Sequence, residues 1–418
     1  MYPLSFQALK PAWRRSSHEV RTRIASNVVY LGLTSLLTDI SSEMVTSVLP
    51  LYLMFQLQLS PAALGVVDGL HQGGASLVKL VGGFVTDRTR RHKHVAAAGY
   101  GLSALCKLGL LLLGKTAFAL GILTLIDRLG KGMRTAPRDA ILSLSVNREQ
   151  LGAAFGVHRT LDTAGAMLGP LVAFGILRLV PEAYDVIFVV SFLLGLVGLA
   201  VLLSFVRNPE VRRSASSRRI GPREVLGLLV DRRLKALLIV AAVCGLATVS
   251  DPLLYLVLQR RLQFDADLVP LLYVATPSVY MLLALPVGRL ADRVGRIRIV
   301  LLGYGLLPAV YAVAAAPLPG VVALPLTVVL LGAHYAATDG VLMAVASSCL
   351  PDALRASGLS VVSTAHQLGR LLASMTFGLL WARLSAPLAL ACFGGFACVW
   401  LATLARPLSR SLTEVPNE

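Results

Sequence analysis

Carboxylates occur inside long apolar stretches of this 418-residue sequence, where a charged side chain is expensive to place. Asp39 and Glu43 stand four residues apart in the first of these stretches, so a helix would present both on one face. Two carboxylates in a medium of low dielectric repel each other when both are ionised, and one of them then takes up a proton readily. We therefore expect this pair to load and release protons.

Further ionisable side chains lie in other apolar stretches and are expected to line a central cavity or to couple protons. They are Asp68, His71, Lys79, Arg128, His158, Arg159, Asp162, Asp251, His366 and Arg370. The alternative for each is a packing hydrogen bond between helices. The cations among them outnumber the partners that are evident from sequence, which favours an anionic or chelating substrate.

Arg128 lies close to the middle of its apolar stretch. An unpaired charge at that depth costs at least about 2.5–3.5 kcal/mol, so a carboxylate partner is expected. Asp39 and Asp162 are the candidates at matching depth, counted at 1.5 Å per helical residue.

Two segments rich in glycine and arginine follow the second and the eighth apolar stretch. Their candidate gate residues are Gly83, Asp87, Arg88 and Arg91 in the first copy, and Gly288, Asp292, Arg293, Gly295 and Arg296 in the second. A carboxylate at a helix end can pair with loop arginines or a neighbouring helix N-terminus, so each copy is expected to join two helices at a cytoplasmic gate. Arg90 replaces the loop glycine in the first copy, whose turn therefore lacks glycine's freedom at positive φ.

The fifth apolar stretch contains Gly156, Gly165, Gly169 and Pro170 in the spacing G-x8-G-x3-GP. Small residues let membrane helices approach closely, and a proline inside a helix produces a kink. The pattern predicts close packing at a bend, and ordinary small-residue packing is the alternative.

These residues are held by a chain of membrane composition, with 56% hydrophobic residues, 15% charged residues and a mean hydropathy of +0.73. A helix needs about 20 mostly apolar residues to cross a bilayer. Twelve such stretches are found near 27–56, 61–86, 94–114, 117–142, 150–178, 184–206, 235–260, 267–290, 297–316, 321–349, 356–383 and 386–406. They leave no room for a separate soluble domain.

The net charge of +17 comes mainly from Lys and Arg in alternate loops, so it reports topology rather than nucleic-acid binding. Both termini are predicted to be cytoplasmic. We predict a cytoplasmic segment at 1–26, a six-helix bundle at 27–206, a basic linker with a short interfacial helix at 207–234, a second bundle at 235–406 and a cytoplasmic tail at 407–418.

Enzymatic chemistry is not indicated by any pattern in the sequence. The five cysteines lie in apolar stretches without metal-ligand spacing, and no phosphate-binding loop, catalytic triad or metalloprotease motif occurs. We therefore expect no cofactor, no metal site and no enzyme activity.

Together, the two loop segments, the fifth-stretch pattern and the six-plus-six repeat resemble the major facilitator superfamily. The resemblance implies an all-α membrane protein of 12 transmembrane helices in two pseudo-symmetric six-helix bundles, which moves a small molecule by alternating access. It also implies a multi-pass protein of the bacterial inner membrane that works as a monomer. The fifth-stretch pattern is similar to the antiporter motif of drug:proton exporters, although Ala173 and Phe174 replace its closing glycine pair.

The function expected from these features is proton-coupled efflux of a small organic molecule, with protons and the lipid bilayer as the other partners. One alternative is a proton symporter that imports a small metabolite through the same residues. A second alternative is a non-transporting membrane sensor or a lipid translocator.

Overall fold

Helices make up nearly all of the computed structural model, which describes residues 26–74, 92–113, 116–146, 150–208, 232–348 and 355–413. The first half contains α1 (Ser26–Leu51) with a π-helical turn η2 (Tyr52–Gln56), a helix at 61–74, α3 (His92–Leu113), α4 (Ala117–Leu144), α5 (Leu151–Leu179) and α6 (Tyr184–Phe205). The second half contains α8 (Arg232–Ala247), α9 (Asp251–Leu262), the short η4 (Ala266–Leu268), α10 (Val269–Val294), α11 (Arg296–Ala315), α12 (Gly320–Ser348), α13 (Arg355–Arg383) and α14 (Ala386–Thr413).

Within these ranges, nine helical spans are long and apolar enough to cross a membrane. A bilayer offers no water to backbone N–H and C=O groups, so a spanning segment must bond them internally, as a helix does. Large apolar side chains such as Phe118, Leu179 and Val321 are exposed on the outside of the molecule. Exposed leucines and valines of this kind are suited to contact with lipid tails.

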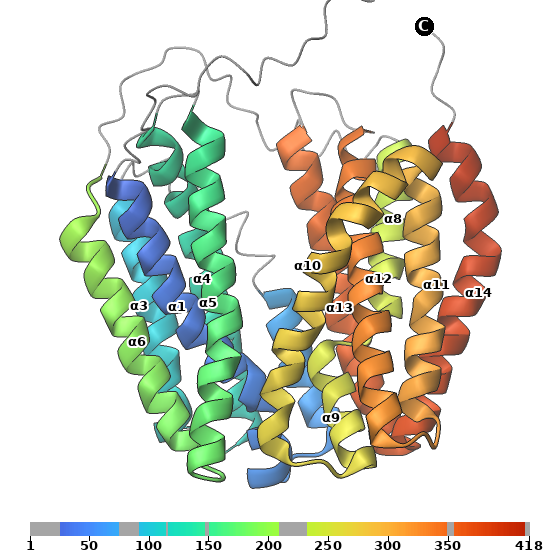
Figure 1. Cartoon of the computed structure of the whole chain (residues 1–418), viewed down its shortest axis with the longest axis horizontal. Helices are drawn as coiled ribbons and strands as arrows, with labels where there is room; N and C mark the ends of the chain where they lie inside the picture. The colour runs from blue at the N-terminus through green and yellow to red at the C-terminus, as the bar shows by residue number, and fades with distance from the viewer. Residues whose placement is uncertain are drawn as a thin grey trace, which may run out of the picture.

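The helices form two bundles in which corresponding helices make corresponding contacts (Figure 1). In the first bundle α1 packs against α5 and α6, and α3 packs against α4 and α6. In the second bundle α8 packs against α13 and α14, and α11 packs against α12 and α14. Each of these four contacts of the first bundle thus has a counterpart in the second, as expected for a duplicated unit.

The two bundles lie apart at one end and meet at the other (Figure 1). Helix α1 begins and α14 ends at the spread end, which is the end that the distribution of Lys and Arg predicts to be cytoplasmic. At the converged end α10 contacts α5, α9 contacts α1, and Arg178 Nη1 lies 3.2 Å from Asp267 Oδ2.

The predicted seventh span is interrupted at residues 248–250, between α8 and α9. Ser250 has an extended backbone and Pro252 stands in the first turn of α9. Proline lacks an amide hydrogen and fits the first turn of a helix, where that hydrogen has no partner, so Asp251-Pro252 starts a new helix. The predicted interfacial helix of the linker lies outside the described residues.

Glycines of the helix at 61–74 pack directly against α13 of the other bundle. A methyl group on Gly65 would lie 2.5 Å from the Ser374 carbonyl oxygen, and one on Gly69 would lie 2.9 Å from the Leu371 carbonyl oxygen. On α13, a methyl group on Gly378 would lie 2.7 Å from the Gly65 Cα. Small residues spaced four apart therefore bring the backbones of the two bundles into contact.

We predict that Gly65→Val opens the converged end, because the added side chain cannot fit against the α13 backbone and overpacking costs about 1–3 kcal/mol. A cysteine introduced at Leu256, which is buried where the bundles meet, should then react faster with a membrane-impermeant maleimide. Gly395→Val is the matched control, since a methyl group there meets nothing within 4 Å. Equal labelling rates in both variants and the parent would contradict this role of Gly65.

Candidate functional site

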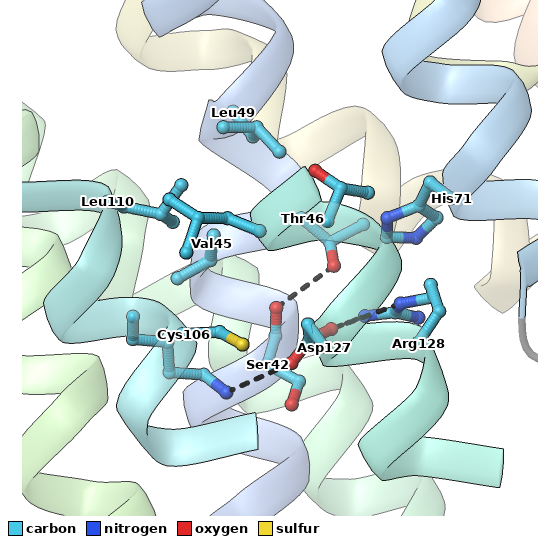
Figure 2. A pocket seen from close by; sticks show the side chains of 12 residues that line it. Ser42, Val45, Thr46, Leu49, His71, Cys106, Leu110, Asp127 and Arg128 are labelled. Atoms are coloured by element: carbon cyan, nitrogen blue, oxygen red, sulfur yellow. Dashed lines mark hydrogen bonds and ion pairs between the residues drawn. The ribbon is translucent and has the colours of Figure 1, made fainter. Parts of the chain in front are cut away.

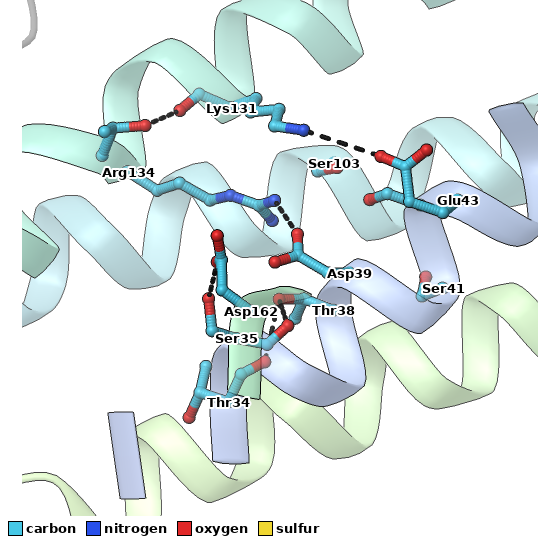
Figure 3. Close-up of polar contacts among 12 residues, drawn as sticks. Thr34, Ser35, Thr38, Asp39, Ser41, Glu43, Ser103, Lys131, Arg134 and Asp162 are labelled. Carbon is cyan, nitrogen blue, oxygen red and sulfur yellow. Dashed lines mark hydrogen bonds and ion pairs between the residues drawn. The ribbon is translucent and has the colours of Figure 1, made fainter. Parts of the chain in front are cut away.

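Cations on α4 pair with carboxylates on α1 inside the first bundle. Arg134 Nη2 lies 3.6 Å from Asp39 Oδ1, and Lys131 Nζ lies 3.9 Å from Glu43 Oε1 (Figure 3). The two helices run in opposite directions, so the acid that comes later in α1 meets the cation that comes earlier in α4. The spacing of four residues on α1 and three on α4 places both pairs along one helix contact.

A third pair extends this contact to α5. Arg138 Nη1 lies 3.6 Å from Asp162 Oδ1. The same carboxylate oxygen accepts a hydrogen bond of 2.8 Å from Ser35 Oγ (Figure 3). Arg159 also reaches Asp162, at 3.4 Å, but its side chain is 77% exposed. We call the three pairs the α4 ion-pair ladder: Glu43–Lys131, Asp39–Arg134 and Asp162–Arg138.

The middle pair of the ladder is the most deeply buried. Asp39 is 8% exposed and Arg134 is 3% exposed, and the guanidinium carbon lies 4.4 Å from the centre of the Tyr100 ring. Charges taken out of water are tolerated only when paired, and removal of one partner leaves the other uncompensated. The ladder therefore ties α1, α4 and α5 together as long as its carboxylates are ionised.

Arg128 does not pair with Asp39 or Asp162, so that prediction is wrong. Its Nη2 lies 2.5 Å from the carboxylate of the preceding residue, Asp127 (Figure 2). Asp39 and Asp162 instead pair with Arg134 and Arg138, which come later in α4. Depth counted along the sequence could not tell which of these arginines faces which acid. The general expectation, that a cation at this depth has a carboxylate partner, is confirmed.

Asp127 also bonds residues of α3. Ser103 Oγ donates a hydrogen bond of 2.5 Å to Asp127, and Lys107 Nζ lies 3.7 Å from the same carboxylate. Lys107 is 5% exposed and was missed by the sequence reasoning. A lysine in the middle of the apolar stretch near 94–114 was the available signal.

Two neighbouring cavities share the side chain of His71. The first lies between α1, the helix at 61–74, α3 and α4, and Asp127 and Arg128 line it (Figure 2). The second lies between the two bundles and is lined by Asp68 and by residues of α9, including Pro252. His71 thus connects the charged interior of the first bundle with the contact between the bundles.

The second bundle contributes a separate group of polar side chains. Tyr335 donates a hydrogen bond to Asp251, and the Tyr304 hydroxyl lies 3.4 Å from His366 Nε2. Arg370 lies within electrostatic range of Asp251.

His158 belongs to the first bundle. It is buried on α5, and its Nε2 has no hydrogen-bond partner within the described ranges.

Two glycines of the fifth-stretch pattern lie against the backbone of α1. A methyl group on Gly165 would lie 2.6 Å from the Leu36 carbonyl oxygen, and one on Gly169 would lie 2.7 Å from the Ile40 carbonyl oxygen. Pro170 follows inside the same helix. The close packing predicted for this pattern is present at both positions. Gly156 has open space around it, so its spacing in the pattern has no packing role here.

The second loop segment joins the end of α10 to the start of α11. Gly295 has a φ of 111°, which explains the glycine at this turn. Asp292 Oδ1 accepts hydrogen bonds of 2.9 and 3.0 Å from Arg296, and both side chains are largely exposed. The predicted pairing with a loop arginine is therefore present. Of this segment, Gly288 has open space around it and Arg293 lies in the last turn of α10.

The remaining predicted positions lie outside the described residues. They are Lys79, Gly83, Asp87, Arg88 and Arg91.

A family model described as Major Facilitator Superfamily matches residues 31–276 and 236–418. The chain belongs to the Major Facilitator Superfamily. It is therefore a multi-pass membrane transporter and not an enzyme. An uncharacterized MFS-type transporter of Methanocaldococcus jannaschii is 29% identical over 372 residues, which cover 88% of this chain and 91% of the relative.

Solved structures of this superfamily share the fold at low sequence identity. The nucleoside transporter NupG superimposes with a TM-score of 0.79 at 15% identity, over 91% of this chain and 99% of that chain. A bacterial homologue of the human lysosomal transporter Spinster, in an inward-facing and unoccupied conformation, gives 0.73 at 14% identity, over 92% of this chain and 96% of that chain. A D-xylose-proton symporter gives 0.68 at 18% identity, over 90% of this chain and 97% of that chain.

We predict that Arg134→Gln destabilises the protein by about 3–5 kcal/mol, because it leaves the buried Asp39 carboxylate without its cation. The double variant Arg134→Gln with Asp39→Asn should recover most of that loss, since two neutral amides need no counter-charge. Thermal unfolding of the purified proteins measures both effects. Arg159→Gln serves as the control, because the Arg159 side chain is 77% exposed. Additive losses in the double variant would show that the two side chains do not interact.

Proposed function

We propose that this transporter is a proton-coupled exporter of a small organic molecule in the bacterial inner membrane, working as a monomer. The observation that carries the proposal is the buried Asp39–Arg134 pair, at 3.6 Å between α1 and α4. A buried carboxylate held by a cation can exist in two charge states, and the strength of its link to the neighbouring helix depends on which state is occupied.

Protonation of Asp39 removes the charge that Arg134 binds and loosens the contact between α1 and α4. Deprotonation restores it. The neighbouring pairs of the α4 ion-pair ladder keep the helices aligned while the middle pair opens. In alternating access the two bundles rock about a central site. The Asp39–Arg134 link opens when Asp39 takes up a proton from one side of the membrane and closes when it releases the proton to the other side. This couples proton flow to the rocking motion.

Export as the direction of transport is supported by the packing of α5 against α1. Gly165 and Gly169 bring the α5 backbone against the helix that carries Asp39 and Glu43, so movement of α5 is transmitted to the proton-binding helix. This is the part of the chain that resembles the antiporter motif. An importer could use the same carboxylates, and the D-xylose-proton symporter has the same fold, so direction must be measured.

An anionic or chelating substrate was expected from buried cations without evident partners. Arg128 has its partner in Asp127 and Arg159 has one in Asp162. Arg370 lies among carboxylates, and Lys79 lies outside the described residues. The described cations therefore do not support an anion site, and we do not include substrate charge in this proposal.

We predict that Asp39→Asn abolishes gradient-driven transport while the protein still inserts into the membrane, because the amide has the same shape but carries no proton. The measurement uses inside-out vesicles with an acidified lumen and a panel of labelled organic acids, amines and sugars. An exporter accumulates its substrate in these vesicles, whereas a proton symporter empties preloaded vesicles.

Asp185→Asn is the control, because it removes an exposed carboxylate at the start of α6. Undiminished coupled transport by Asp39→Asn would remove Asp39 from the mechanism. Neutral replacements of both Asp39 and Arg128 without effect would favour the alternative of a membrane sensor or a lipid translocator.

A further inference from the structure

Three carboxylates share one arginine between the two bundles. Asp68 comes from the helix at 61–74, Asp251 begins α9 and Asp339 lies on α12, and Arg370 of α13 is within electrostatic range of all three. We call these four residues the inter-bundle acidic site. With three ionised carboxylates and one guanidinium, the site has two uncompensated negative charges among the residues that the structure describes.

Other charges near the site already have partners. Glu43 pairs with Lys131, and Arg128 pairs with Asp127, so neither changes the balance. Three histidines also border the site and carry no charge in their neutral form: His71, His334 and His366. Because Asp68 is only 9% exposed, its share of the negative charge cannot be solvated by bulk water. A positively charged group bound at this place would therefore offset the negative charge that Arg370 leaves uncompensated.

Buried polar atoms at the same place lack partners. Ser250 and Ser374 are 0% exposed, and neither hydroxyl makes a hydrogen bond within the described part of the chain. Both serines adjoin Asp68, whose Oδ2 also has no hydrogen-bond partner there. Both hydroxyls are placed to donate to the Asp68 carboxylate, whose remaining lone pairs can accept a hydrogen bond from an N–H group of a ligand.

Three tyrosine side chains lie near Asp251: Tyr255, Tyr273 and Tyr335. Tyr335 donates a hydrogen bond to that carboxylate. The rings of Tyr255 and Tyr273 are 5.0 Å apart in an edge-to-face arrangement, and both lie within electrostatic range of Asp251. Aromatic faces attract cations, especially where water is excluded. Carboxylates and tyrosines together are suited to a substituted ammonium group.

We propose that the inter-bundle acidic site binds a positively charged ammonium group of the transported molecule. This proposal rests on the proposed transport function and names its substrate class. The site spans both bundles, as a substrate site for alternating access must, since Asp68 belongs to the first bundle and Asp251, Asp339 and Arg370 belong to the second. Arg370 orients the carboxylates and leaves part of their charge free for the ligand.

The test measures binding to the purified protein without a proton gradient, by the shift of the thermal unfolding midpoint. The probes are methylammonium, ethylammonium and benzylammonium, compared with methanesulfonate and benzenesulfonate at equal ionic strength. A ligand that binds the folded state raises the midpoint with its concentration. Ammonium ions should raise it, and sulfonates should not.

Asp339→Asn should weaken the ammonium response about tenfold in half-saturating concentration, as expected for loss of one charge-assisted contact. Asp339 is exposed, so this variant is expected to fold, whereas Asp251→Asn alters a half-buried carboxylate that Tyr335 binds. Asp185→Asn is the matched control and should respond like the parent.

A midpoint raised by sulfonates and not by ammonium ions would overturn the proposal. So would an unchanged ammonium response in both Asp339→Asn and Asp251→Asn, or no response to any of the three ammonium ions. A failure of proton coupling in vesicles would leave this binding result intact. Loss of ammonium binding would likewise leave the role of Asp39 standing, so the two proposals fail separately.

Discussion

The ion pair between Arg134 and Asp39 is the interaction on which the first bundle depends. Both side chains are almost completely buried in a contact between two helices inside the first bundle. Neither charge is tolerable there alone, so the helices that carry them are held at fixed depth and rotation. Lys131–Glu43 and Arg138–Asp162 then follow from helix geometry, because residues three or four apart on one helix lie on the same face.

Close backbone contacts determine how such a bundle can move. Within the first bundle, Gly165 and Gly169 place α5 directly against α1. Between the bundles, Gly65 and Gly378 do the same for the helix at 61–74 and α13. Interfaces without intervening side chains transmit small displacements and separate without the repacking of large groups. The first contact therefore links α1, which carries Asp39 and Glu43, to its neighbour α5, and the second joins the two bundles at the converged end.

The charge balance differs between the two polar regions of the protein. In the first bundle each carboxylate of the ladder has a cation within 4 Å, although Arg138 also pairs with Asp139 and Asp162 is also reached by Arg159. Between the bundles three carboxylates share Arg370. A balanced network responds to protons by opening and closing links between helices, whereas an unbalanced one attracts a cation. The proton-coupling region and the substrate site that we propose are therefore neighbours, and His71 lines a cavity next to each of them.

The sequence by itself determined the helical class and most helix positions, because long apolar stretches can exist in a bilayer only as helices with internal hydrogen bonds. The stretch predicted near 184–206 is α6 at Tyr184–Phe205, and the one near 297–316 is α11 at Arg296–Ala315. It also determined that deeply placed charges such as Arg128 need partners.

Only the tertiary structure decided which partners they have. Several acids lie at similar depth in the membrane. Which of them a cation meets depends on how each helix is rotated and which helices are neighbours, and counting residues along the sequence gives neither. Asp39 therefore pairs with Arg134 and leaves Arg128 to Asp127. The sharing of Arg370 by three acids appears only once the helix at 61–74, α12, α13 and the start of α9 are brought together.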